Sequence, residues 1–170
     1  MSALIPNMTS NTTPSGVASA SSIYDSSYDA FDAMTGSPSF STFWNDGNGV
    51  SLPQWLRYDF DSPVTAASFS IMAWDSGGPL VFEIQGSNDG FSTYTTLGSF
   101  DLTMSSPWGV YNTPPIASYS NNLTASSYAG YRLYVTSGTG GGNLSITEFQ
   151  LYDVPVPGMT GYFGRIKLGM

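Results

Sequence analysis

The sequence contains neither cysteine nor histidine. The absence of cysteine excludes disulfides, thiolate nucleophiles and zinc sites with sulfur ligands. The absence of histidine excludes the commonest general base, the Ser-His-Asp arrangement and imidazole-bound metals. No segment approaches the roughly 20 apolar residues of a membrane-spanning helix. The opening residues, MSALIPNMTSNTTPSG, lack a basic start and a long apolar run, so we expect no signal peptide.

Positive charge is also scarce in this chain. Lys and Arg together number 4 against 12 Asp and Glu, and the formal net charge is -8. The basic residues are Arg57, Arg132, Arg165 and Lys167. Nucleic acids and anionic lipid surfaces are bound through clusters of Lys and Arg. The composition therefore argues against a nucleic-acid partner and against a membrane partner.

Turn-forming and aromatic residues are abundant instead. The 170 residues include Gly 19 and Pro 11, and aromatic residues make up 15%. This combination is typical of many short strands joined by turns. The length suits one well-buried core. We therefore predict a single all-β domain with appended segments.

Composition and periodicity divide the chain into three segments. Residues 1–22 are small and polar and are interpreted as an N-terminal arm, either mobile or held by contacts. Residues 23–153 are predicted to form an antiparallel β-sandwich, and residues 154–170 a C-terminal tail. Alternating apolar positions predict strands over residues 56–60, 68–74, 80–85, 94–102, 131–135 and 144–152, with a long loop over 103–127.

Two local irregularities are expected within these strands. The Ser-Asn-Asp-Gly run at residues 87–90 predicts a tight turn. The apolar positions of the last strand change parity between residues 146 and 149, which predicts a β-bulge near Thr147 and Glu148. Such a bulge would redirect the Glu148 side chain.

Five short motifs follow one another along the chain. They are Ala30-Phe31-Asp32 with Thr42-Phe43-Trp44, Trp55-Leu56-Arg57-Tyr58-Asp59-Phe60, Gly86-Ser87-Asn88-Asp89-Gly90, Tyr131-Arg132-Leu133, and Ile146-Thr147-Glu148-Phe149-Gln150-Leu151-Tyr152. In order and spacing, over about residues 21–153, the sequence resembles the discoidin, or coagulation-factor C-type, group of galactose-binding-like domains. The resemblance implies a jelly-roll β-sandwich with a ligand site formed by loops, most often for sugars.

The same resemblance implies a structural calcium ion near one end of the sandwich. Calcium takes six to eight oxygen ligands from carboxylates, carbonyls and hydroxyls. By this resemblance the candidate ligands are Asp32, Thr42 and Glu148, with loop carbonyls completing the shell. The alternative is that Asp32 caps its loop and Glu148 is a solvated strand residue.

Sugar binding requires an aromatic face and a few fixed polar groups. The candidates are Trp74, which Asp75 follows, and Trp108, in a loop that also carries Tyr111. The tryptophans at matched motifs are expected in the core; these are Trp44 and Trp55.

The two strand arginines are further candidates for ligand binding. Arg57 and Arg132 could each donate two hydrogen bonds to a hydroxyl pair or a carboxylate. The alternative is that each pairs with Asp59 or another acid of the chain.

The C-terminal tail has its own composition. The weakly alternating run GYFGRIKL could add as a strand to a neighbouring sheet edge, with its positive charges against an acidic surface. The predicted docking residues are Tyr162, Phe163, Arg165 and Lys167, and the acidic surface could belong to another protein or to a second copy of this chain. The alternative is a frayed end.

The low-complexity opening also resembles the leaders of discoidin-like domains on bacteriophage virion proteins. We therefore predict a non-enzymatic virion surface protein, of the head or tail, that binds other virion proteins and contacts host-surface glycans. One alternative is a structural decoration or cement protein that binds no sugar. The other is a carbohydrate-binding module of a bacterial glycan-processing system. Catalysis is not expected, because a glycosidase needs two opposed carboxyl groups and the only glutamates are Glu83 and Glu148.

Overall fold

Nearly all regular structure in the chain is extended. The computed structural model describes residues 2–39, 41–47, 50–74, 77–108, 117–139 and 143–156. The elements are β1 (Val17–Ala20), the 3-10 helix η1 (Ala30–Ala33), β2 (Trp44–Asn45), β3 (Gln54–Ala73), β4 (Pro79–Ser87), β5 (Thr95–Asp101), β6 (Ala117–Gly138) and β7 (Ser145–Tyr152). Every strand pairing is antiparallel, which confirms the predicted all-β architecture. None of the helices in the described ranges is long and apolar enough to cross a membrane.

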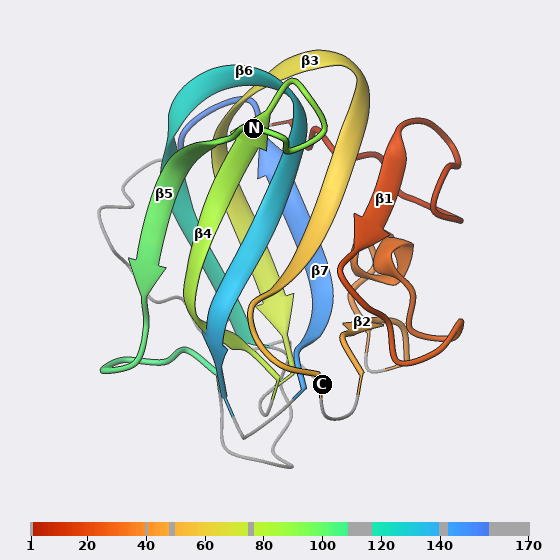
Figure 1. Ribbon diagram of the computed structural model, residues 1–170, viewed down its shortest axis with the longest axis vertical. Helices are drawn as coiled ribbons and strands as arrows, with labels where there is room; N and C mark the ends of the chain where they lie inside the picture. Colours follow the sequence, from red (N-terminus) through yellow and green to blue (C-terminus); the bar gives the residue numbers. More distant parts are fainter. Residues whose placement is uncertain are drawn as a thin grey trace.

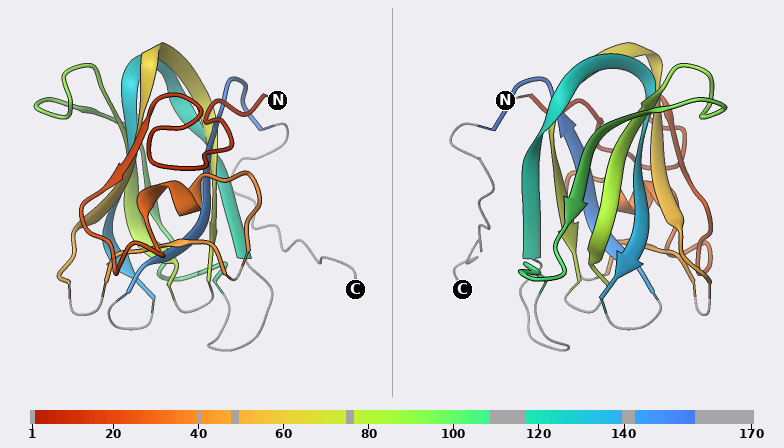
Figure 2. Two further views of the ribbon diagram at one scale, coloured as in Figure 1. Left: turned by 90° about the vertical axis from the view of Figure 1, so that its right-hand side faces the viewer. Right: turned by 60° about the vertical axis from the view of Figure 1, so that its left-hand side comes forward.

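The long strands β3 and β6 join the two layers of the sandwich. Residues 54–59 of β3 pair with residues 130–135 of β6, the register then shifts, and residues 64–73 pair with residues 117–128. Both strands curve over the same end of the molecule (Figures 1 and 2), which we call the arch end. The opposite end, here the loop end, contains β2 and the connections that precede β3, follow β3 and follow β6.

Each layer has its own strand order. One layer contains β1, the first part of β3, the second part of β6, β4 and β5. The other contains the first part of β6, the second part of β3, β7 and β2. The interior between these layers is the hydrophobic core.

The structure corrects two sequence-based strand assignments. The strands predicted over 56–60 and 68–74 are parts of β3, and the loop predicted over 103–127 includes the first half of β6. Residues 117–128 read ASYSNNLTASSY, a small and polar run without apolar alternation. Their strand conformation is supported by pairing with β3 rather than by their own pattern.

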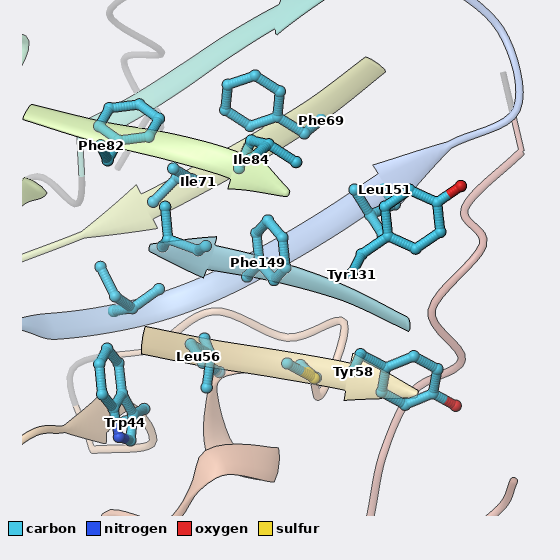
Figure 3. Close-up of a cluster of buried hydrophobic side chains, with 14 of the residues drawn as sticks. Trp44, Leu56, Tyr58, Phe69, Ile71, Phe82, Ile84, Tyr131, Phe149 and Leu151 are labelled. Atoms are coloured by element: carbon cyan, nitrogen blue, oxygen red, sulfur yellow. The ribbon is translucent and has the colours of Figure 1, made fainter. Parts of the chain in front are cut away.

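The alternation seen in the sequence identifies the inward faces of the other strands. Tyr131, Leu133 and Val135 of β6 are each 0% exposed. Phe82 and Ile84 of β4 are 1% and 0% exposed and meet them from the neighbouring strand. Figure 3 shows side chains of both layers meeting in this core, including Trp44, whose predicted burial is confirmed. Trp55, also expected in the core, is only half-buried.

A buried tyrosine hydroxyl stabilises the arch end. The Tyr131 hydroxyl accepts a hydrogen bond from Ala66 N at 3.2 Å. It also lies 2.7 Å from the carbonyl oxygens of Val64 and Ser126, one of which accepts its proton. The side chain therefore holds β3 and β6 together where both change layers.

The segment interpreted as an N-terminal arm packs against the sandwich in this structure. Ile5 and Met8 are 1% and 2% exposed, and Leu4 N donates to Leu151 O at 2.8 Å. Strand β1 pairs with β3, so residues 2–22 cover one side of the molecule (Figure 2). Single apolar residues within a polar run anchor this segment. Because they do not repeat at a regular spacing, the search for alternating apolar positions does not detect them.

The predicted bulge in the last strand is confirmed. Met72 pairs with Glu148 and the next residue, Ala73, pairs with Ile146, so Thr147 is the extra residue. Both Thr147 and Glu148 are buried. Strand β7 is buried on both faces from Ser145 to Leu151, so the burial of Glu148 follows from the cover on both sides of this strand as well as from the bulge.

Candidate functional site

Trp74 lies at the loop end, directly after β3. Its backbone N–H donates to Ser145 O at 3.1 Å, which ties the start of this connection to β7. The side chain is half-buried, and its ring centroid lies 5.0 Å from that of Phe43. Trp74, a predicted sugar-binding residue, therefore presents part of an indole at the loop end.

Three further rings continue from Trp74 toward solvent. Phe43 lies 4.7 Å from Tyr28, and Tyr28 lies 5.8 Å from Tyr24, as measured between ring centroids. Tyr24 is 49% exposed. We call Tyr24, Tyr28, Phe43 and Trp74 the aromatic row. Sequence reasoning missed its first three members, although the regular spacing of aromatics through Ser and Asp in this stretch was a visible signal.

Backbone hydrogen bonds hold the aromatic row in place. Tyr24 N donates to Asn45 O at 2.9 Å, and Asn45 N donates to Tyr28 O at 3.4 Å. The Asn45 amide donates to Ser145 Oγ at 3.0 Å. These contacts attach the tyrosine-bearing loop to β2 and β7, so the row is largely preformed, as small-ligand sites usually are.

A hollow of about 280 Å³ lies at the same end. Its lining combines apolar side chains, hydroxyls and an amide; the residues are Val50, Leu52, Thr136, Ser137, Gly138, Thr139, Asn143 and Leu144. Leu144 N donates to Asp46 Oδ1 at 2.8 Å, which connects the wall of the hollow to the segment after β2. This volume and mixed lining suit one or two sugar rings.

Asp46 is a buried acid beside this hollow. It is 1% exposed, and its Oδ2 atom has no hydrogen-bond partner among the described residues. Burial raises the pKa of Asp46 from 3.8 to about 6, although the Leu144 N–H opposes the shift. The carboxyl group therefore takes up a proton more readily than an exposed aspartate does.

Trp108 does not form part of an exposed site in this structure. Its side chain is 5% exposed, and its indole N–H donates to Pro79 O at 2.6 Å. Gly78 lies against the ring, and a Cβ atom at that position would overlap it. The sequence interpretation of Trp108 as a stacking residue is therefore wrong for this conformation, because a glycine provides the space that buries the ring.

The structure places Arg57 and Arg132 away from the aromatic row and next to each other. They are cross-strand partners on β3 and β6, on the outer face, where they alternate with buried neighbours. Arg57 Nε lies 2.7 Å from Asp59 Oδ2, so the expected pairing of Arg57 with Asp59 is confirmed. Arg57 also donates to Gly90 O, in the loop between β4 and β5, at 3.3 Å.

The candidate calcium ligands occupy separate hydrogen-bonded positions. Glu148 is 6% exposed, and its carboxylate oxygens accept from Gly36 N at 3.2 and 3.1 Å. Asp32 Oδ2 accepts from Asp29 N at 2.9 Å, an interaction that caps η1 as the alternative reading proposed. Burial raises the pKa of Asp32, and raises that of Glu148 to about 7. Thr42 is half-buried two residues before Trp44.

Several predicted site residues cannot be placed. Asp75, Tyr111 and the docking residues Tyr162, Phe163, Arg165 and Lys167 lie outside the described residues. In the part of the chain that is described, no group of three or more Asp, Glu, His or Cys side chains is arranged to hold a metal ion.

Solved structures provide the comparison for this fold. The chain matches no protein-family model and no curated protein sequence. Chitosan-binding module 1 of a chitosanase/glucanase from Paenibacillus sp. IK-5 is 24% identical with a TM-score of 0.67, over 89% of this chain and 99% of that one. Module 2 of the same enzyme, solved with chitotriose, is 24% identical with a TM-score of 0.64, over 81% and 95%. The family 32 carbohydrate-binding module of NanJ from Clostridium perfringens, solved with galactose, is 20% identical with a TM-score of 0.63, over 80% and 92%.

These similarities show that the sandwich is of the galactose-binding-like type. The matched structures are carbohydrate-binding modules, and this chain spans almost the full length of each.

Proposed function

We propose that this chain is a non-catalytic carbohydrate-binding module that holds a saccharide at its loop end. The observation that carries the proposal is the aromatic row, which runs from half-buried Trp74 to exposed Tyr24 at the same end as a hydroxyl-lined hollow. Aromatic faces stack on the C–H faces of sugars, and nearby hydroxyl and amide groups orient the ring. The similarity to modules solved with chitotriose and with galactose supports the same ligand class.

A binding role fits the chemistry of the chain better than catalysis. The sequence contains no histidine, and its two glutamates are engaged in internal hydrogen bonds. Glu83 Oε2 accepts from Gln85 Nε2 at 2.6 Å and from Thr96 Oγ1 at 2.9 Å, while Glu148 accepts from Gly36 N. Both glutamate carboxylates are thus occupied by hydrogen bonds within the fold, whereas a glycosidase needs a pair of carboxyl groups free to act on the substrate.

The virion location remains a prediction from the resemblance of the opening residues. It is compatible with sugar binding, because a virion surface protein could carry such a module to a host glycan. The cement-protein alternative differs, since it predicts that no saccharide binds. A saccharide-binding measurement therefore separates these two hypotheses.

We expect Trp74→Ala to lower the affinity for chitotriose or a galactose trimer at least tenfold, or about 1.4 kcal/mol, because the largest stacking face is removed. Isothermal titration calorimetry measures the affinity directly. Tyr24→Ala, at the exposed end of the row, has a smaller effect. Trp55→Ala is the matched control, since Trp55 is also half-buried but lies on β3 beside Tyr134. Equal affinities for Trp74→Ala and wild type would contradict the proposed site, and no binding by wild type would favour the cement protein.

Calcium binding is a second proposal. Its support is that two of the predicted ligands, Asp32 and Glu148, are buried acids that form no ion pair with any described residue. A bound cation would compensate these charges, although it would compete with the Gly36 and Asp29 N–H groups for the carboxylates.

Calcium at 100 times its Kd should stabilise the fold by about 2.7 kcal/mol, or raise Tm by about 5–10 °C. We expect Glu148→Gln to remove this response, as measured by thermal unfolding in EDTA and in excess Ca²⁺. Asp101→Asn, an exposed change of the same charge, should retain it. An unchanged wild-type Tm in excess Ca²⁺ would contradict calcium binding. The role of Glu148 would then be to accept the hydrogen bond from Gly36 N.

A further inference from the structure

Two guanidinium groups lie side by side on the outer face of the layer that contains β4 and β5. Arg57 and Arg132 are directly opposite each other on β3 and β6. They are the only Lys or Arg residues within the described ranges of a chain whose net charge is -8. Like charges at opposed positions destabilise a sheet unless other groups compensate them. The pair therefore needs a physical explanation.

Aromatic rings surround Arg132. Its Cζ atom lies 4.4 Å from the ring centroid of Phe91, 5.1 Å from that of Tyr94 and 5.0 Å from that of Tyr134. Phe91 also contacts Arg57, whose Cζ lies 4.7 Å from the ring centroid. We call Arg57, Phe91, Tyr94, Arg132 and Tyr134 the arginine–aromatic cluster. Tyr94 is its most accessible ring and is 55% exposed.

The two arginines differ in how their charge is compensated. Arg57 forms an ion pair with Asp59. Arg132 Nε donates to Gln85 Oε1 at 2.6 Å, and Gln85 in turn donates to Glu83, so a neutral amide lies between Arg132 and Glu83. No carboxylate of the described residues forms a salt bridge with Arg132. Burial lowers the pKa of Arg132, as expected for a partly desolvated cation without a close counter-charge.

The loop between β4 and β5 holds the cluster in a defined shape. Phe91 has φ 68, a left-handed conformation that is unusual for a bulky residue and costs free energy. Phe91 N donates to Ser87 Oγ at 2.9 Å, and Asp89 Oδ1 accepts from Thr93 N at 2.9 Å. The loop projects from the arch end (Figure 2), and its internal hydrogen bonds keep the Phe91 ring over the arginines.

A second hollow adjoins the cluster at Tyr94. It has a volume of about 200 Å³, and most of its lining is polar: Ser87, Asn88, Asp89, Thr93, Thr95 and Tyr128. Hydroxyl and amide groups beside an exposed aromatic ring suit a sugar ring. The arginine–aromatic cluster is thus continuous with a surface that can accept a polar ligand.

We propose that the arginine–aromatic cluster is a second saccharide site, separate from the loop end, that binds a sugar carrying a carboxylate. The terminal nitrogens of Arg132 donate to the carboxylate, and Tyr94 stacks on the sugar ring. The adjoining hollow also contains the Asp89 carboxylate, so it takes the hydroxyl groups of the next ring rather than a second carboxylate. Arg132 suits this role because its planar guanidinium matches a carboxylate and its charge is not already paired within the described residues. The ligand class, a saccharide, rests on the proposed function, whereas the site and the anionic group rest on this cluster alone.

The test compares a galacturonate trimer with the matching galactose trimer, which differ in whether C6 carries a carboxylate. In ¹H–¹⁵N and aromatic NMR spectra of the full chain, we expect galacturonate to shift the signals of Arg132 Nε and of the Tyr94 and Phe91 rings. The galactose trimer should shift the Trp74 indole signal and leave those signals unchanged. Galacturonate shifts confined to Trp74, or no galacturonate shifts, overturn the second site.

Variants give an independent readout. Arg132→Gln should weaken galacturonate binding at least tenfold, and Arg132→Lys should also weaken it because lysine lacks the planar fork. Met104→Ala, an exposed change outside the cluster, should alter it by no more than about twofold. Trp74→Ala should leave galacturonate binding unchanged and weaken only the binding of the galactose trimer, by at least tenfold. If both Arg132 variants bind galacturonate as tightly as wild type, the proposal is overturned. Failure of wild type to bind the galactose trimer contradicts the loop-end site and leaves the test of the Arg132 site intact.

Discussion

We expect Phe69→Ala to lower the free energy of unfolding by about 3–5 kcal/mol, the usual range for removing a fully buried phenylalanine. Phe69 is 0% exposed and lies on the part of β3 that belongs to the β7 layer. Its ring centroid is 6.1 Å from Phe82, 5.0 Å from Phe100 and 6.0 Å from Tyr119. Since Phe82 and Phe100 belong to the opposite layer, the substitution opens a cavity between the layers. Urea unfolding followed by tryptophan fluorescence measures the loss.

Two further variants make this measurement specific. Met104→Ala is the surface control, because Met104 is 95% exposed and its removal should change stability by less than about 0.5 kcal/mol. Phe69→Leu retains most of the volume and should cost less than the alanine variant. A loss below about 1.5 kcal/mol in Phe69→Ala would mean that the neighbouring rings close the cavity.

The second large effect concerns pH. The pKa of Asp46 is raised by burial from 3.8 to about 6, so the folded state binds the proton more tightly than the unfolded state. The contribution of Asp46 is therefore fully present below pH 3.8 and is lost as the pH rises through about 6. At 1.36 kcal/mol per pKa unit, the loss amounts to about 3 kcal/mol. Wild-type stability should fall between pH 4 and pH 7.5 by this route.

Asp46→Asn isolates the effect, because an amide cannot titrate and retains an oxygen that can accept from Leu144 N. We expect the difference in unfolding free energy between wild type and Asp46→Asn to decrease by about 2–3 kcal/mol from pH 4 to pH 7.5. Asp101→Asn removes the same charge at the surface. Hydrogen bonds from Thr103 lower the pKa of Asp101, so this control should leave the pH slope above 4 unchanged. A constant difference for Asp46→Asn would show that Asp46 keeps its ordinary pKa.

The pH response also bears on the sugar site. Asp46 binds the N–H of Leu144, and Leu144 lines the hollow at the loop end. Stability and saccharide affinity should therefore be measured at the same pH, so that a change in the fold is not mistaken for a change in the site.

The candidate site could be predicted only in part. Trp74 was identified because a tryptophan followed by Asp-Ser-Gly-Gly indicates a loop beside a strand end. The same reasoning failed for Trp108, since nothing near it in sequence indicates that Gly78 provides its pocket. The adjacency of Arg57 and Arg132 was also beyond sequence reasoning, because it depends on the register between two distant strands.

By itself, the sequence determined which residues face inward and where the strands are irregular. The buried positions Tyr131, Leu133 and Val135, and the bulge at Thr147, follow from the period of two that a strand backbone imposes on its neighbours. The tertiary structure alone decided that β3 and β6 pass from one layer to the other, that residues 2–22 pack against the sandwich through Ile5, Met8 and Ala18, and that two arginines share one aromatic cluster. The physical reason is the separation of the interacting residues along the chain. Side-chain alternation depends on neighbouring residues, whereas strand pairing and burial depend on contacts between residues far apart in the chain.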